Sequence, residues 1–271
     1  MKMAACQLVS GTDKAANLAE IERLAAAAAA EGAQLAVFPE YAMHYTPKFS
    51  QEFVDEAEPL DGDFVTALRG VASRHGISII AGMHERIPGE RRAYNTIVVA
   101  GPGPEPGPEP GPVAVYRKQH LYDAFGFKES DFLCPGPLGE PATFEVDGVV
   151  VGLLTCYDLR FPEVSRTVVD AGAQLLVYPA AWMPGPRKED HWQTLARARA
   201  IENTVYVAAI SQAPPVGVGG SLIVDPNGVV LGGLGEASGT IVVPVEAGRI
   251  DRVRAFNPSL ANRRYAVVPH D

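Results

Sequence analysis

The chain has 271 residues, enough for one large α/β domain or two small ones, so its fold needs no disulfide or metal to hold it together. Its formal net charge is -9, its acidic residues are dispersed, and no basic stripe with interleaved aromatic residues is present, which argues against nucleic acid as a partner. No apolar run reaches ~18 residues, the length that a membrane-spanning helix needs.

The first residues lack the apolar core of a signal peptide. The three cysteines, Cys6, Cys134 and Cys156, are scattered and odd in number, which is not the pattern of a disulfide framework. We therefore expect a protein of the reducing cytoplasm.

Strands and helices are predicted in alternation along the N-terminal part of the chain. Short continuous apolar runs indicate buried strands, and an Ala-rich stretch ended by Gly32 indicates a helix. In chain order, the predicted elements are a strand at 3–9, a helix at 13–31, a strand at 35–38, a helix at 64–75, and strands at 77–81, 96–100 and 113–116.

The C-terminal part continues with a strand that runs up to Cys156. The further predicted elements are a helix at 162–171, a strand at 175–178, a helix at 192–202, and strands at 205–210, 221–224, 229–231 and 240–245. Residues 225–228, Asp-Pro-Asn-Gly, have the composition of a hairpin turn. This alternation, together with hairpins, predicts an α/β sandwich of mixed sheets, formed by one domain over residues 1–271.

Residues 31–40 and 171–180 are similar to each other: both contain Gly-Ala-Gln followed by a short apolar run and a proline. Such an internal repeat indicates two similar halves that pack together. One copy ends in Glu40 and the other in Ala180, and a carboxylate at the end of a buried strand is costly unless it has a partner or a role. By contrast, residues 101–112 alternate Pro and Gly, which predicts an exposed, partly extended loop.

Cys156 is the candidate nucleophile. It follows an apolar run and precedes residues typical of a helix start, with Pro162 and Glu163 in the expected first turn. A thiol at such a junction faces the positive end of the helix dipole, which we expect to lower its pKa.

A nucleophilic thiol needs a base, and its reaction needs a positive group for the developing oxyanion. Glu40 and Lys118 each follow a predicted strand, and strand ends gather at one edge of an α/β sheet. Glu40 can accept the thiol proton, while Lys118 can stabilise the oxyanion. A cysteine–histidine dyad is the competing arrangement, in which His44 or His120 would lie near the pocket. No histidine or cysteine spacing is typical of a metal site.

These residues lie in segments that resemble the nitrilase superfamily of carbon–nitrogen hydrolases. The matching segments, in the family's order, are residues 38–40, 116–123, 155–163, 178–182, 191–192, 197–203 and 221–228. The resemblance implies a four-layer αββα sandwich of two mixed β-sheets flanked by helices, which pairs into homodimers or larger homo-oligomers.

The resemblance also implies a catalytic Glu40–Lys118–Cys156 triad, with Glu129 holding Lys118. The oxyanion would lie between Lys118 and the backbone N–H of Tyr157, and no cofactor or metal is required. The segment from Cys156 to Glu163 is most similar to the branch of omega-amidases and deaminated glutathione amidases. In these enzymes the substrate is a small linear amide. We expect the substrate to contact Arg160, Tyr41, His120 and Trp182.

The predicted activity is hydrolysis of a primary amide of a carboxylic or 2-oxo acid through a cysteine thioester, with release of ammonia. Three alternatives stay open: a nitrilase, an N-carbamoyl amino acid amidohydrolase, and an acyltransferase that passes the thioester to an amine. A non-enzymatic binding protein is a further alternative. The Gly-rich stretch at 217–220 precedes a strand, which is the wrong context for a phosphate loop. Three segments depart from the family pattern or from these amidases: Gly219-Gly220-Ser221, the Pro-Gly tract, and Phe125-Gly126-Phe127.

Overall fold

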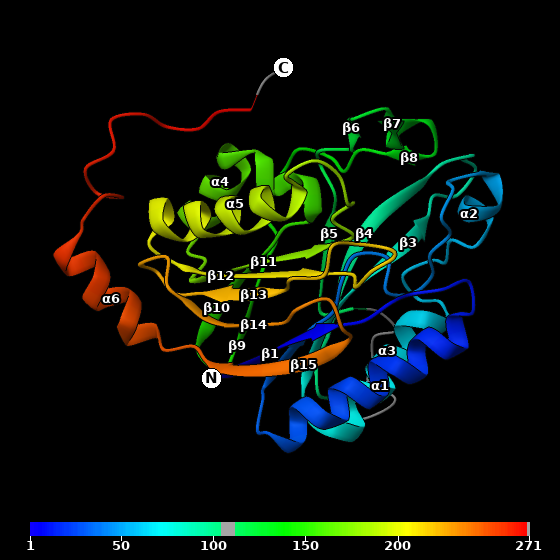
Figure 1. The fold of residues 1–271 in the computed structure, drawn as a ribbon, viewed down its shortest axis with the longest axis horizontal. Helices are drawn as coiled ribbons and strands as arrows, with labels where there is room; N and C mark the ends of the chain where they lie inside the picture. The colour runs from blue at the N-terminus through cyan, green and yellow to red at the C-terminus, as the bar shows by residue number, and fades with distance from the viewer. Residues whose placement is uncertain (104–111, 270–271) are drawn as a thin grey trace.

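A computed structural model describes residues 1–103 and 112–269 of the chain. Two β-sheets pack face to face, and a pair of helices covers the outer face of each sheet (Figure 1). Helices α1 (Lys14–Ala30) and α3 (Asp63–His75) lie on one side, and α4 (Pro162–Asp170) and α5 (Lys188–Asn203) lie on the other. The architecture is therefore the predicted αββα sandwich.

The first sheet has the strand order β15-β1-β2-β3-β4-β5, with β8 paired to β4. Strands β1, β2 and β3 are parallel to one another, while β15, β4 and β5 add antiparallel edges. The strands are β1 (Lys2–Gln7), β2 (Leu35–Val37), β3 (Ser78–Arg86), β4 (Ala93–Ala100), β5 (Ala114–Arg117), β8 (Leu133–Cys134) and β15 (Gly239–Pro244).

The second sheet has the order β14-β13-β12-β11-β10-β9 and repeats this plan. Strands β10, β11 and β12 are parallel, β9 and β13 pair antiparallel with β10 and β12, and β14 pairs antiparallel with β13. The strands are β9 (Thr143–Val146), β10 (Val149–Leu153), β11 (Leu175–Ala180), β12 (Tyr206–Ser211), β13 (Leu222–Val224) and β14 (Val230–Gly233).

Smaller elements complete the chain. They are α2 (Gln51–Asp55), the hairpin of β6 (Asp123–Ala124) and β7 (Phe127–Lys128), the 3-10 turns η1 (Glu129–Asp131) and η2 (Cys156–Arg160), and α6 (Ala247–Phe256). Within the described ranges, no helix is long and apolar enough to cross a bilayer.

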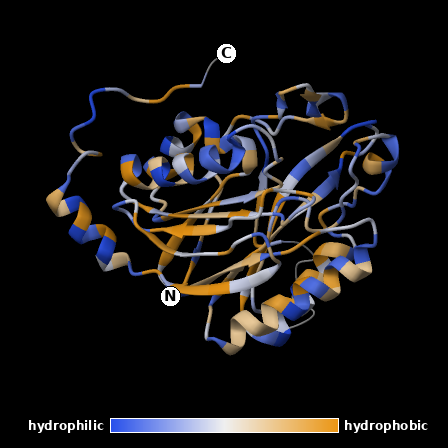
Figure 2. Ribbon diagram, viewed as in Figure 1, coloured by the Kyte–Doolittle hydropathy of each residue, from blue (hydrophilic) through white to orange (hydrophobic). Residues whose placement is uncertain are grey.

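Apolar strand residues form the main core between the two sheets, and a second core fills the space between the first sheet and helices α1 and α3. Figure 2 shows the same division, with apolar strands inside and helices that are apolar on one side only. Helix α1 begins where the Asp13 side chain accepts the backbone N–H groups of Ala15 and Ala16.

The two similar sequence segments occupy equivalent places in the two sheets. Gly32 and Gly172 both have positive φ, +79° and +99°, where the helix before each strand ends. The Gln34 side chain accepts the backbone N–H of Lys2, and the Gln174 side chain accepts that of Val150 in the same relation. The internal repeat therefore corresponds to two similar halves.

Several boundaries differ from the prediction. The strand expected to reach Cys156 ends at Leu153, because the chain turns into η2. Helix α5 begins at Lys188 instead of at residue 192, since its first turn is polar and carries no apolar signal. Strand β9 and the β6–β7 hairpin were not predicted. Residues 104–111 of the Pro-Gly tract lie outside the described residues.

Candidate active site

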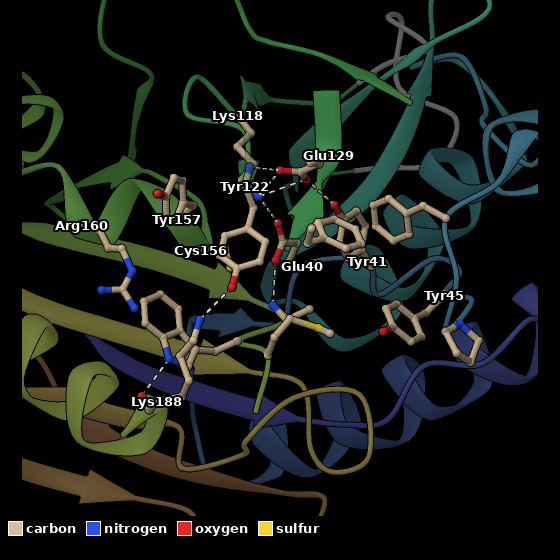
Figure 3. Close-up of a pocket in the computed structure, with 16 residues that line it drawn as sticks. Glu40, Tyr41, Tyr45, Lys118, Tyr122, Glu129, Cys156, Tyr157, Arg160 and Lys188 are labelled. Atoms are coloured by element: carbon tan, nitrogen blue, oxygen red, sulfur yellow. Dashed lines mark hydrogen bonds and ion pairs between the residues drawn. The ribbon is translucent and has the colours of Figure 1, made fainter. Parts of the chain in front are cut away.

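A cavity with about 560 Å³ of empty volume, partly open to solvent, lies at the end of the sandwich where several strands terminate. Figure 3 shows the residues that line it. Glu40, Lys118, Glu129 and Cys156 lie among them, so the structure brings four predicted site residues, from four separate segments, to one place.

Glu40 follows strand β2 at a sharp turn. Tyr41 adopts a left-handed backbone conformation with φ +58°, which is uncommon for a residue with a side chain. Strand β3 passes so close that a Cβ on Gly82 would lie 2.6 Å from the Tyr41 backbone nitrogen, so only glycine fits there. The tight turn holds Glu40, which is 1 % exposed, at the base of the cavity.

Lys118 lies directly after β5 and is held between two carboxylates. Its Nζ is 3.0 Å from Glu40 Oε1 and 2.9 Å from Glu129 Oε2, and the side chain is 1 % exposed. Burial alone would lower the pKa of Lys118, but the charges of Glu129 and Glu40 raise it well above its usual value. The two carboxylates therefore favour the charged ammonium form of Lys118.

Asn95 and Tyr41 fix both carboxylates in place. The Asn95 side-chain amide donates to Glu40 Oε1 at 2.6 Å, and the Tyr41 hydroxyl donates to Glu129 Oε1 at 2.6 Å. The backbone N–H of Ala181, just past β11, donates to Glu40 Oε2 at 2.7 Å. Every oxygen of the two carboxylates thus has a donor, so their orientation is set before any substrate binds.

Cys156 is the first residue of η2 and has φ +42°, a strained conformation that is typical of functional sites. Burial raises the pKa of its thiol well above the usual value, and the nearby Glu40 carboxylate raises it further, while Lys118 opposes this effect. The prediction of a lowered thiol pKa was wrong. The regular helix starts only at Pro162, and the effects of burial and of the Glu40 charge exceed that of a short helical turn.

Asp158 ties the nucleophile segment to the lysine segment. Its completely buried carboxylate accepts the Thr155 N–H at 3.0 Å, the Tyr116 hydroxyl at 2.7 Å, and the backbone N–H of His120 at 3.2 Å. Tyr116 belongs to β5, two residues before Lys118. The distance between Cys156 and Lys118 is thereby fixed by one carboxylate.

The other predicted site residues separate into two groups. Tyr41, Tyr157, Arg160 and Trp182 line the cavity. His120 does not: its Nδ1 lies 2.7 Å from Asp158 Oδ1, and its ring stacks on Phe161. The structure thus does not support substrate contact by His120.

His44, also expected near the pocket, is buried against Phe53 and His84 behind the cavity wall. Neither His44 nor His120 lines the cavity, which disfavours a cysteine–histidine dyad. Glu40 lines the cavity together with Cys156, and its charge raises the pKa of the thiol.

Sequence reasoning missed two features of the cavity. Lys188, 4 % exposed, lies at the side occupied by Arg160, where its Nζ donates to the Tyr122 hydroxyl at 2.8 Å. The lining also contains the aromatic residues Tyr45 and Phe49, and Tyr45 lies on the side away from Arg160 in Figure 3. The Lys188 position carried no motif, while the aromatic residues come from loops whose course no local pattern reveals.

This arrangement places a thiol, a carboxylate and a fixed ammonium group around one space, the set of groups that covalent catalysis at an amide requires. The N–H of Tyr157 belongs to the first residues of a helical turn, which have no acceptor within that turn. Within the part of the chain that the structure describes, no group of three or more His, Cys, Asp or Glu residues could hold a metal ion.

Comparisons with known proteins agree with this geometry. The family model described as carbon–nitrogen hydrolase matches residues 2–255. A protein named only as a hydrolase from Mycobacterium tuberculosis is 41% identical over 96% of this chain and 94% of its own length. A deaminated glutathione amidase from Escherichia coli is 39% identical over 90% of this chain and 89% of its own.

A solved structure extends the likeness to the whole fold. Nit3 from Saccharomyces cerevisiae, a member of branch 10 of the nitrilase superfamily, has a TM-score of 0.83 and 27% sequence identity, covering 98% of this chain and 97% of that one. The chain therefore belongs to the carbon–nitrogen hydrolase family within the nitrilase superfamily, and the prediction of an amidase that acts on non-peptide carbon–nitrogen bonds is confirmed.

Proposed function

We propose that the protein hydrolyses the primary amide of a small linear carboxylic or 2-oxo acid through a thioester on Cys156 and releases ammonia. The observation that carries this proposal is the Glu40–Lys118–Glu129 cluster, buried and fully hydrogen-bonded, against the Cys156 thiol. Relatives named deaminated glutathione amidase support the amide class.

The first half of the reaction forms the thioester. Because the pKa of the thiol is raised, Cys156 is protonated at rest, and its proton moves to Glu40 as the sulfur attacks the amide carbon. The new C–S bond leaves a tetrahedral oxyanion between the Lys118 ammonium and the Tyr157 N–H. Glu40 then gives its proton to the nitrogen, the C–N bond breaks, and ammonia leaves.

The second half releases the acid. Glu40 accepts a proton from water as the water oxygen attacks the thioester carbon, and the C–S bond breaks. The proton on Glu40 returns to the departing sulfur, which restores the thiol and the carboxylate. Lys118 transfers no proton in either half, in keeping with its raised pKa.

The proposal is tested by ammonia release from deaminated glutathione, 2-oxoglutaramate, 2-oxosuccinamate, N-carbamoyl amino acids, aliphatic amides and simple nitriles. We expect the first three to be the best substrates. Rapid-quench mass spectrometry should find an acyl group on Cys156 in the wild-type protein and none in Cys156→Ala, which should be inactive with an unchanged fold.

Cys134→Ala is the matched control, since Cys134 is the only partly exposed cysteine and lies in β8, outside the cavity lining. It should retain full activity. Turnover of amides by Cys156→Ala would refute the proposal. Preferred hydrolysis of nitriles or carbamoyl compounds, or transfer to an amine in place of water, would refute the amide hydrolase assignment.

A further inference from the structure

Two cationic side chains line the same side of the cavity without an acidic partner. Arg160 and Lys188 both contribute to the lining, and in Figure 3 they lie together on the side opposite Tyr45. Among the described residues, no carboxylate oxygen forms an ion pair with either of them. The third cation of the cavity, Lys118, is by contrast held by two carboxylates.

Aromatic rings hold the two cations in place. Lys188 Nζ lies 4.0 Å from the centre of the Phe125 ring and 4.9 Å from that of Tyr122, while the Arg160 guanidinium lies 4.9 Å from the Trp182 ring. Trp182 also fixes the backbone at Lys188, because its indole N–H donates to the Lys188 carbonyl at 2.8 Å. The cationic groups are therefore positioned before a ligand arrives.

Both groups keep unused hydrogen-bond donors. The Lys188 ammonium has three N–H donors, of which one is directed to the Tyr122 hydroxyl. The Arg160 guanidinium has one hydrogen-bond contact with a side chain of the described structure, at 3.4 Å with His191 Nδ1, and its buried Nε has no hydrogen-bond partner there. Donors on rigid supports, next to a cavity, form a site for an acceptor with negative charge.

The electrostatics of the two cations also favour a bound anion. Burial lowers the pKa of Lys188, and the neighbouring Arg160 charge lowers it further. A buried cation without a counter-charge is costly, and a second cation beside it adds repulsion. A bound anion would remove both costs.

We propose that Lys188, together with Arg160, binds a carboxylate group at the end of the substrate remote from the scissile amide. This site selects amides that carry a free carboxylate over neutral amides of the same length. The inference deepens the proposed function and rests on it. Lys188 is in this view a specificity-determining residue, and Tyr122 positions it.

The test uses a matched pair of substrates, succinamate and its neutral methyl ester, and the ratio of their kcat/KM values for ammonia release. The wild-type protein should prefer succinamate. Lys188→Met should lower this ratio about 10- to 100-fold, the range expected for one hydrogen bond between charged groups. Lys188→Arg, which keeps the charge, should retain most of the preference.

Arg187→Met is the matched control, because Arg187 is the adjacent cation but is exposed and paired with Asp190 at 2.8 Å. It should not change the ratio. The inference is overturned if Lys188→Met lowers kcat/KM for both substrates equally, which is the result expected of a merely structural lysine, or if Arg187→Met has the same effect as Lys188→Met.

A binding measurement separates this inference from the proposed function. Calorimetry with succinate should show binding to Cys156→Ala and a 10-fold or greater loss of affinity in Cys156→Ala/Lys188→Met. If the wild-type protein releases ammonia from neither amide, the proposed function is wrong, and the binding result still decides the role of Lys188. Equal affinity in the two proteins would refute that role.

The wild-type protein alone provides a further test if Lys188→Met does not fold. Because the pKa of Lys188 is lowered, its charge is lost below the usual lysine range of about 10.4 as the pH rises. The ratio of kcat/KM for succinamate to that for the ester should therefore decline at alkaline pH, starting below that value. A ratio that does not decline when Lys188 loses its charge would overturn the inference.

Discussion

Replacement of Lys118 by methionine should destabilise the fold as well as abolish activity. Lys118 Nζ makes three hydrogen bonds, one to Glu40 at 3.0 Å and two to Glu129 at 3.1 and 2.9 Å, in a place where all three side chains are at most 2 % exposed. Lys118→Met keeps the apolar stem but leaves two buried carboxylates without a cation. Removal of one partner from such a cluster costs about 3–5 kcal/mol.

The loss of stability is measured by urea denaturation, followed by far-UV circular dichroism, at pH 8 and at pH 5. The loss should be smaller at pH 5, because two buried carboxylates without a cation bind a proton more readily in acid. Ammonia release should fall by a factor of about 100 or more, as expected for loss of an oxyanion-stabilising group.

Lys128→Met is the matched control. Lys128 is a cation in the neighbouring hairpin, and it also pairs with a carboxylate, that of Asp131 at 2.9 Å, but it is 66 % exposed. The substitution Lys128→Met should leave both stability and activity unchanged, since solvent screens an exposed ion pair. If Lys118→Met were as stable as the wild-type protein at pH 8, the buried cluster would not be the ionised network described above.

Two further predictions concern buried groups near the site, and a third concerns assembly. Asp158→Asn should lower kcat more than it raises KM, as measured by steady-state kinetics. The asparagine NH2 group would face the four donors that now surround the Asp158 carboxylate, and the resulting clash would displace the Cys156 turn. Burial lowers the pKa of His84 well below 6.5, so the native state excludes a proton that the unfolded chain binds. His84 therefore lowers the free energy of unfolding as the pH falls through about 6.5, by up to about 1.4 kcal/mol per pH unit. Urea titrations at pH 5.5 and 7.5 should show that His84→Leu removes this dependence. The homodimer or larger homo-oligomer expected from the family resemblance should appear in sedimentation equilibrium, and a monomer at micromolar concentration would contradict it.

Local patterns predicted an α/β sandwich of mixed sheets, and they singled out the residues that the structure brings to one cavity. Short apolar runs indicated the buried strands, and Asp13 and Gly32 marked the ends of the first helix correctly. Glu40 and Lys118 were found because each lies directly after such a strand. These are properties of a few neighbouring residues, so a single sequence is enough to reveal them.

The thiol environment could not be predicted in the same way. The expectation of a lowered pKa for Cys156 used only the residues next to it in the chain. The pKa is instead raised, by burial and by the charge of Glu40, which lies 116 positions away in the sequence. The proposed role of Glu40 is the same in either case, since Glu40 is already the expected acceptor of the thiol proton.

The internal repeat explains why the base lies where it does. Glu40 ends the repeat in the first sheet, and Ala180 ends it in the second; the next residue, Ala181, donates its backbone N–H to Glu40 Oε2 at 2.7 Å. Two equivalent strand ends thus meet, and the half without a carboxylate supplies a donor to the half that has one. Sequence similarity alone indicates two halves, whereas only their packing shows that one half positions the proposed base of the other. The substitution Glu40→Ala should therefore leave the Ala181 N–H without its acceptor and destabilise the contact between the sheets, in addition to removing the base.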